Sequence, residues 1–115
     1  MDISPLPLFP ELELLDARVE GQQLLITLKN AGAFTIRTRT YGQPEYRLIA
    51  KLFDGDREVQ DRWLALPRDL PPGATATVTF AVLPPQPQLS LRLYHAIQDI
   101  PMLDPEAWAE VRIVR

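Results

Sequence analysis

The sequence contains no cysteine, and it has only one histidine and two serines among its 115 residues. Without cysteine, disulfides, thiol nucleophiles and cysteine-ligated zinc or iron–sulfur sites are excluded. The single histidine, His95, leaves few ways to build a metal site or a nucleophile–base pair. We therefore predict a protein that is not an enzyme and that uses neither a metal nor a cofactor.

Long apolar runs are also missing. No stretch approaches the roughly 18 apolar residues of a membrane-spanning helix. The acidic, proline-interrupted start differs from a secretion signal, which has a basic region followed by an unbroken apolar one. The net charge of -3 gives no reason to expect a nucleic-acid partner. We expect no membrane insertion, and a location in the cytoplasm or within an assembled particle.

The length and composition indicate one globular domain. A chain of 115 residues with 46% hydrophobic and 23% charged residues has enough apolar side chains for its own core. The twelve prolines fall in clusters too short to act as linkers between domains. We assign residues 1–10 to a proline-rich apolar arm and residues 11–115 to the domain.

Apolar and polar residues alternate with a period of two, which is typical of strands. The pattern slips near Leu15 and Asp16, which indicates a bulge. Glu20-Gly21-Gln22 is expected to form a turn, and Asp54-Gly55-Asp56 is typical of a hairpin turn. Short strands with regular turn signals predict an all-β immunoglobulin-like β-sandwich of about seven or eight antiparallel strands. The expected strands are residues 11–19, 24–29, 34–41, 46–53, 59–66, 75–82, 89–97 and 108–114.

Four segments carry a resemblance to a known type of domain. They are LLITLKNAG at 24–32, YRLIAKLFDG at 46–55, RWLALPRDLPPG at 62–73 and LRLY at 91–94. They resemble the strands, the Asn-x-Gly turn and the Leu-Pro…Leu-Pro-Pro-Gly crossover of bacterial immunoglobulin-like accessory domains. Such domains are appended to envelope-associated enzymes, and related sandwiches decorate phage particles. The resemblance implies a non-catalytic binding or spacing role without naming a ligand.

One group of basic and aromatic residues is a candidate binding surface. Arg37, Arg39 and Tyr41 fall on one face of an expected strand, and Arg47, Lys51 and Phe53 fall on a neighbouring strand. Planar cations beside aromatic rings can stack on sugars or grip acidic groups. The same spacing also occurs on an ordinary solvated sheet face, so both interpretations stay open.

The two tryptophans are candidate stacking platforms for a sugar ring. Trp63 precedes the proline-rich crossover, a position that more often belongs to the core of a sandwich. Trp108 opens the last expected strand, where the core is again the more common location. We retain both residues as candidate ligand contacts.

Two other pairs of polar residues do not favour catalysis or metal binding. Ser90 and His95 are five positions apart in one expected strand, so they point to opposite faces. Asp54 and Asp56 lack the further oxygen ligands that calcium requires. The first pair is best explained as strand residues and the second as a solvated turn.

The arm has apolar side chains at Leu6, Leu8 and Phe9 between its prolines. Proline favours an extended path, so such a segment can dock with a small loss of conformational entropy. It could follow an edge of its own sandwich or dock on a neighbouring subunit.

These observations leave three hypotheses for function. The first is an interaction module that contacts protein or glycan at a bacterial envelope or in a larger assembly. The second is a structural subunit of a phage particle, a head decoration or tail protein held by its arm. The third is a carbohydrate-binding module. A protein partner or larger assembly is expected, with a glycan and self-association as further possibilities.

Overall fold

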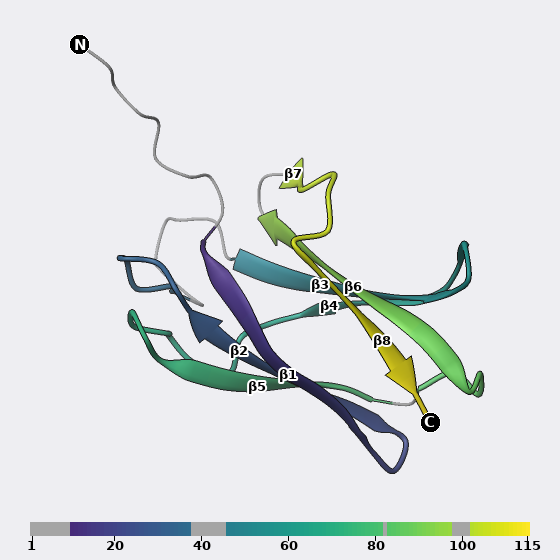
Figure 1. Ribbon diagram of the computed structural model, residues 1–115. Coiled ribbons are helices and arrows are strands. Elements are labelled where there is room, and N and C mark those ends of the chain that lie inside the picture. The colour runs from purple at the N-terminus through teal and green to yellow at the C-terminus, as the bar shows by residue number, and fades with distance from the viewer. Residues whose placement is uncertain (1–9, 38–45, 82, 98–101) are drawn as a thin grey trace.

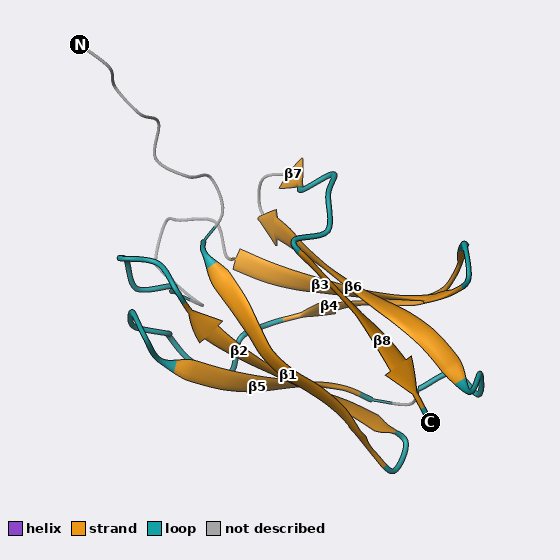
Figure 2. Ribbon diagram, in the orientation of Figure 1, coloured by secondary structure: helices purple, strands orange, loops and turns teal. Residues whose placement is uncertain are grey.

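The computed structural model describes residues 10–37, 46–81, 83–97 and 102–115. In this part of the chain every regular element is a strand, as Figure 2 shows. The described residues include no helix long and apolar enough to cross a membrane. The arm residues Leu6, Leu8 and Phe9 lie outside the described residues, as do Arg39 and Tyr41.

The first sheet has three antiparallel strands in the order β1-β2-β5. Strands β1 and β2 form a hairpin, and β5 joins the free side of β2 from much later in the chain (Figure 1). Strand β5 is therefore at one edge of this sheet and β1 at the other. The bounds are Leu12–Glu20 for β1, Gln23–Asn30 for β2 and Thr75–Phe80 for β5.

The second sheet has five strands, and all its pairs are antiparallel. Its order is β4-β3-β6, with β7 and β8 both paired to β6. Together the two sheets confirm the predicted all-β sandwich. The bounds are Tyr46–Asp54 for β3, Arg57–Leu64 for β4, Gln88–Ile97 for β6, Met102–Leu103 for β7 and Ala109–Val114 for β8.

The main core lies between the two sheets. Alternate residues of a strand point to opposite faces, so every second residue of β2, β3, β5 and β6 reaches the space between the sheets. The side chains of Ile26, Leu48, Phe80 and Leu91 are fully buried there. The period-two pattern of the sequence therefore corresponds to the burial pattern of the strands.

The tight turns and the bulge occur where the sequence predicts them. Gly21 and Gly55 both have a φ of 63°, the left-handed conformation that a two-residue hairpin turn requires. Between β1 and β2 the register shifts from Leu14 to Asp16. Leu15 is the extra residue of this bulge, and it is exposed.

The expected strand at 34–41 is not formed in its described part. Residues 34–37 make only an isolated bridge, in which Ile36 pairs with Leu70 of the crossover between β4 and β5. Ile36 is buried and its two neighbours are exposed. The segment therefore shows the alternating burial that is typical of a strand, although it is not part of either sheet.

Asn30 holds this segment and the crossover in place. Its side chain is buried at the end of β2, where Nδ2 donates to the carbonyl oxygens of Phe34 and Leu70, each at 2.8 Å. Its Oδ1 accepts a hydrogen bond from the backbone N–H of Gly32 at 2.9 Å. One amide group therefore satisfies backbone groups from two loops that are far apart in the sequence.

Replacing Asn30 tests this arrangement. Asn30→Ala leaves two carbonyl groups without their donor, and we expect it to lower the free energy of unfolding by about 3 kcal/mol. Asn30→Asp keeps the acceptor for Gly32 but cannot donate when it is charged, so we expect a similar loss. Urea denaturation measures both changes.

The control is Gln23→Ala, which removes an exposed amide from the same strand. It should change the unfolding free energy by no more than about 0.5 kcal/mol. A loss for Asn30→Ala as small as that of the control would contradict the role of Asn30.

Candidate functional site

The candidate site is the face of the five-stranded sheet that points away from the core. Residues directly opposite each other in antiparallel strands share a face. Ile49 of β3 is opposite both Trp63 of β4 and Tyr94 of β6. We call this surface the outer face, and it consists of Arg47, Ile49, Lys51, Phe53, Trp63, Arg92 and Tyr94.

Ile49 shows that the outer face has an apolar layer of its own. Its side chain is fully buried, yet it is not part of the core cluster between the sheets. Leu48, Ile49 and Ala50 are therefore three consecutive buried residues of β3, which is buried on both sides at its middle. An antiparallel sheet usually leaves one face solvated, so the burial of Ile49 on the outward side is a distinguishing feature.

Cationic side chains lie across the aromatic rings of this face. Lys51 Nζ is 5.4 Å from the centre of the Tyr94 ring, and the guanidinium carbon of Arg92 is 4.2 Å from the centre of the Phe53 ring. Both cations also form ion pairs with flanking strands. Lys51 Nζ is 3.1 Å from Glu58 Oε1 of β4, and Arg92 Nε is 3.5 Å from Glu110 Oε2 of β8. These contacts hold the long side chains in place along the sheet.

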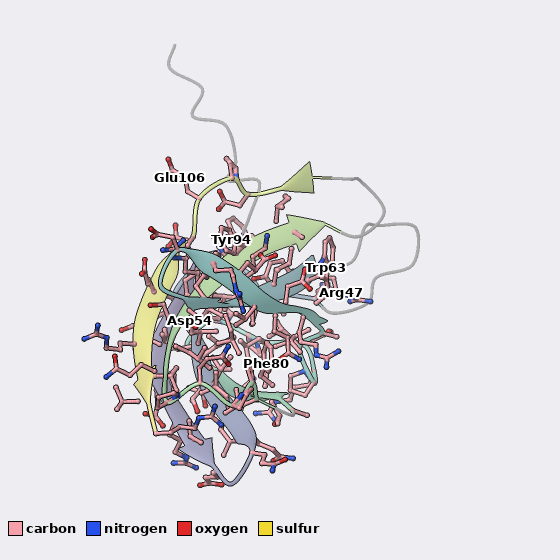
Figure 3. The ribbon with its side chains drawn as sticks, turned by 90° about the vertical axis from the view of Figure 1, so that its right-hand side faces the viewer. Arg47, Asp54, Trp63, Phe80, Tyr94 and Glu106 are labelled. Carbon is pink, nitrogen blue, oxygen red and sulfur yellow. The ribbon has the colours of Figure 1, made fainter. Side chains whose placement is uncertain are left out.

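Trp63 is the exposed aromatic residue of the outer face, with 54% of its surface accessible. The expectation that a tryptophan before the crossover belongs to the core is wrong here. Leu64 pairs with Leu48 on the core side, so Trp63 must point outward with Ile49. Figure 3 shows Trp63 and Arg47 at the same end of the sheet, with Tyr94 across it.

Trp108 lies elsewhere and has a different environment. Its ring stacks on His95, with ring centres 5.2 Å apart and an angle of 8° between the planes. It packs against the core, and its Nε1 is buried without a hydrogen-bond partner among the described residues. Trp63 is in β4, and Trp108 directly precedes β8 at the other side of the sheet. Strands β3 and β6 lie between β4 and β8, so these two strands are about 14 Å apart at the usual strand spacing. The two tryptophans therefore do not form one platform.

His95 is a buried structural residue with a hydrogen bond of 2.7 Å between its Nδ1 and Tyr46 Oη. Burial lowers the pKa of His95 to about 4, while the nearby carboxylate of Asp104 acts in the opposite direction. Burial also raises the pKa of Tyr46 above its usual range. Both groups are therefore neutral at pH 7.

The remaining predicted site residues are not gathered in one place. Arg37 is exposed, just after the bridge at Ile36, and it belongs to neither sheet. Ser90 pairs with Phe53 and His95 pairs with Leu48, so these two residues point to opposite faces as the sequence predicts. In the described part of the chain there is no cluster of three or more potential metal ligands.

Of the outer face, Arg47, Lys51 and Phe53 were expected from the sequence as neighbours of the basic–aromatic set, whereas Ile49, Arg92 and Tyr94 were not. The sequence feature that could have indicated Ile49 is the run of three apolar residues at 48–50, because a strand with one solvated face alternates apolar and polar residues. The partners from β6 could be found only from the register between β3 and β6, which pairs Lys51 with Arg92.

At one end of the outer face lies an open recess of about 200 Å³, lined in part by Phe53, Ser90 and Arg112. Pockets that enclose a small ligand usually measure about 300–1,000 Å³. This recess is too small to enclose one. The outer face itself is a broad surface with one protruding ring.

In comparisons with known proteins, no family model matches the chain and no curated protein matches it significantly. The geometry of the surface therefore carries the functional argument.

The pKa of His95 gives a test of its environment. Because the folded protein resists protonation until about pH 4, the unfolded chain binds the proton first and stability falls between about pH 6.5 and pH 4. His95→Gln removes this proton site. We expect the wild-type protein, relative to His95→Gln, to lose about 3 kcal/mol of unfolding free energy across that range.

Urea denaturation of both proteins at several pH values measures the difference, so carboxylates common to both cancel. A difference that does not change with pH would show that His95 titrates normally in the fold.

Proposed function

We propose that this chain is a non-enzymatic immunoglobulin-like interaction module that binds a protein partner through the outer face. The observation that carries the proposal is the exposed ring of Trp63 beside the fully buried Ile49. A ring supported by a preformed apolar layer loses little conformational entropy on binding.

The composition of the outer face supports a protein partner. Tryptophan, tyrosine and arginine are the residues that most often dominate binding energy at protein interfaces. Here Trp63 and Tyr94 are opposite Ile49 in the two neighbouring strands, and Arg47 is two residues before Ile49 in β3. The surrounding acidic and basic side chains provide the polar rim of such a surface.

The arrangement of the strands supports the immunoglobulin-like part of the proposal. Strands β1, β2 and β5 form one sheet, and β4, β3, β6 and β8 form the other. The chain crosses between the sheets from β2 to β3 and again from β4 to β5, as in Greek-key sandwiches. A setting at a bacterial envelope or in a larger assembly is part of the same proposal, and it rests on the resemblance of the sequence.

The environment of the polar residues supports a role without catalysis. Ser90 and His95 point to opposite faces of β6. His95 is buried against Tyr46 and Trp108, so it is not positioned to exchange protons with a bound substrate.

Glycan binding is the second candidate, and the exposed Trp63 also favours it because an indole face can stack on a sugar ring. The separation of Trp63 from Trp108 limits this alternative to one stacking residue.

The experiment compares wild-type protein with Trp63→Ala. Partners captured from the source cells are identified by mass spectrometry, purified, and titrated by calorimetry. We expect Trp63→Ala to weaken binding at least about 30-fold, as for a dominant interface residue. Because the ring is more than half exposed, the variant should keep its fold, which circular dichroism verifies.

The matched control is Leu15→Ala, which removes an exposed apolar side chain from the other sheet and should leave the affinity unchanged. A partner that binds Trp63→Ala as tightly as wild-type protein would overturn the proposal. If a glycan array shows signals that depend on Trp63 and the purified proteins do not bind, the second candidate replaces the first.

A further inference from the structure

Strand β5 differs from the other edge strands of more than two residues, which are β1, β4 and β8. An open edge exposes backbone hydrogen-bonding groups, and proteins usually protect such edges with charges, bulges or covering segments. Six residues form β5, with the sequence TATVTF. None of them is charged and none is proline, and the strand has no bulge in its pairing with β2.

The other edges carry recognisable protection. Strand β1 has a bulge after Leu14 and an exposed ion pair of 3.2 Å between Arg18 and Glu20. Strand β4 has four charged residues, and β8 has two. Strands β1 and β8 also contact each other along one side of the sandwich. Among the edge strands of more than two residues, β5 alone has neither a charged residue nor a bulge, and the guanidinium of Arg68 from the crossover lies at the Thr75 end of its edge.

The register shows which backbone groups of β5 face outward. Asn30 N–H donates to the carbonyl of Ala74. In an antiparallel pair every second residue makes such bonds, so Ala76, Val78 and Phe80 also direct their backbone groups toward β2. The backbone groups of Thr75, Thr77 and Thr79 therefore point away from the sheet. Arg68 confirms this direction, because its guanidinium reaches the Thr75 carbonyl from outside at 2.9 Å.

We propose that β5 is a self-docking edge, which pairs antiparallel with β5 of a second copy of this chain. In the proposed register Thr77 is opposite Thr77 of the other copy, and Thr75 of each copy is opposite Thr79 of the other. The three residues whose backbone groups point away from the sheet therefore meet the same three residues of the second copy. The Thr77–Thr77 pair can exchange two backbone hydrogen bonds. In each Thr75–Thr79 pair the Thr75 carbonyl already accepts from Arg68, so its second bond requires that carbonyl to accept twice or the guanidinium to move aside. The two three-stranded sheets then become one continuous sheet across a twofold axis.

The side chains favour a second copy as the occupant. In this register threonine faces threonine on the solvent side, and Ala76 faces Val78 on the core side. Threonine pairs across strands are stabilising, and the strand has no like charges to repel each other. A strand of another protein would match this edge only if it repeated the same alternation, which a second β5 does by symmetry.

This surface is independent of the outer face, because β5 belongs to the other sheet. A twofold contact closes on itself, so the expected assembly is a dimer. A ring or lattice, as in a particle subunit, would need a further contact surface.

The test is light scattering of the full chain over a dilution series, with Thr77→Lys as the variant. Two lysines meet across the twofold axis in this variant, so we expect association to weaken at least tenfold. The matched control is Thr27→Lys. Thr27 is opposite Thr77 and shares its face, but it lies in the central strand β2, away from the edge. It should dimerise like wild-type protein.

A charge-reversed mixture gives the sharpest result. Thr77→Lys and Thr77→Glu should each be monomeric alone and should form a heterodimer when they are combined. If Thr77→Lys does not fold, Thr79→Lys replaces it. A wild-type chain that stays monomeric at millimolar concentration, or a dimer that Thr77→Lys leaves unchanged, overturns the proposal.

Discussion

The buried amide of Asn30 is the constraint on which the rest of the sandwich depends. It lies at the end of β2, and it bonds to the backbone of two of the three crossovers between the sheets, the one that follows β2 and the one between β4 and β5. Its own backbone bonds to Ala74 and Gly73, which sets the start of β5. The pairing of β2 with β5 continues from this point to Leu24 and Phe80. A buried polar group with all its partners gives one defined arrangement, because any other leaves its donors or acceptors unpaired.

The second sheet has a different organisation, because its central strand is buried on both sides. The core side of β3 packs against the first sheet, while Ile49 is fully buried on the opposite side. On that side Lys51 lies over the Tyr94 ring and Arg92 over the Phe53 ring, and their charged ends pair with Glu58 and Glu110. The exposed ring of this surface is that of Trp63. The proposed partner surface and the proposed self-docking edge are thus on different sheets and can act at the same time.

Several local features follow from the sequence because they depend only on neighbouring residues. Gly21 and Gly55 marked the hairpin turns, and the phase slip at Leu15 marked the bulge. The segment at 34–37 was misinterpreted because Ile36 alternates with exposed neighbours although it pairs only with Leu70. Trp63 was misplaced because its direction depends on which of two adjacent apolar residues, Trp63 or Leu64, faces the core.

The sequence by itself determined the all-β class, the approximate strands and the turns, because alternation and turn chemistry are local properties of the chain. Only the tertiary structure decided that Trp63 faces outward, that Lys51 lies over Tyr94, and that β5 is an edge. These features depend on the register between paired strands, such as Ile49 with Trp63 or Thr27 with Thr77, and on the order of the strands in each sheet. A shift of one residue in that register would move every side chain of a strand to the opposite face.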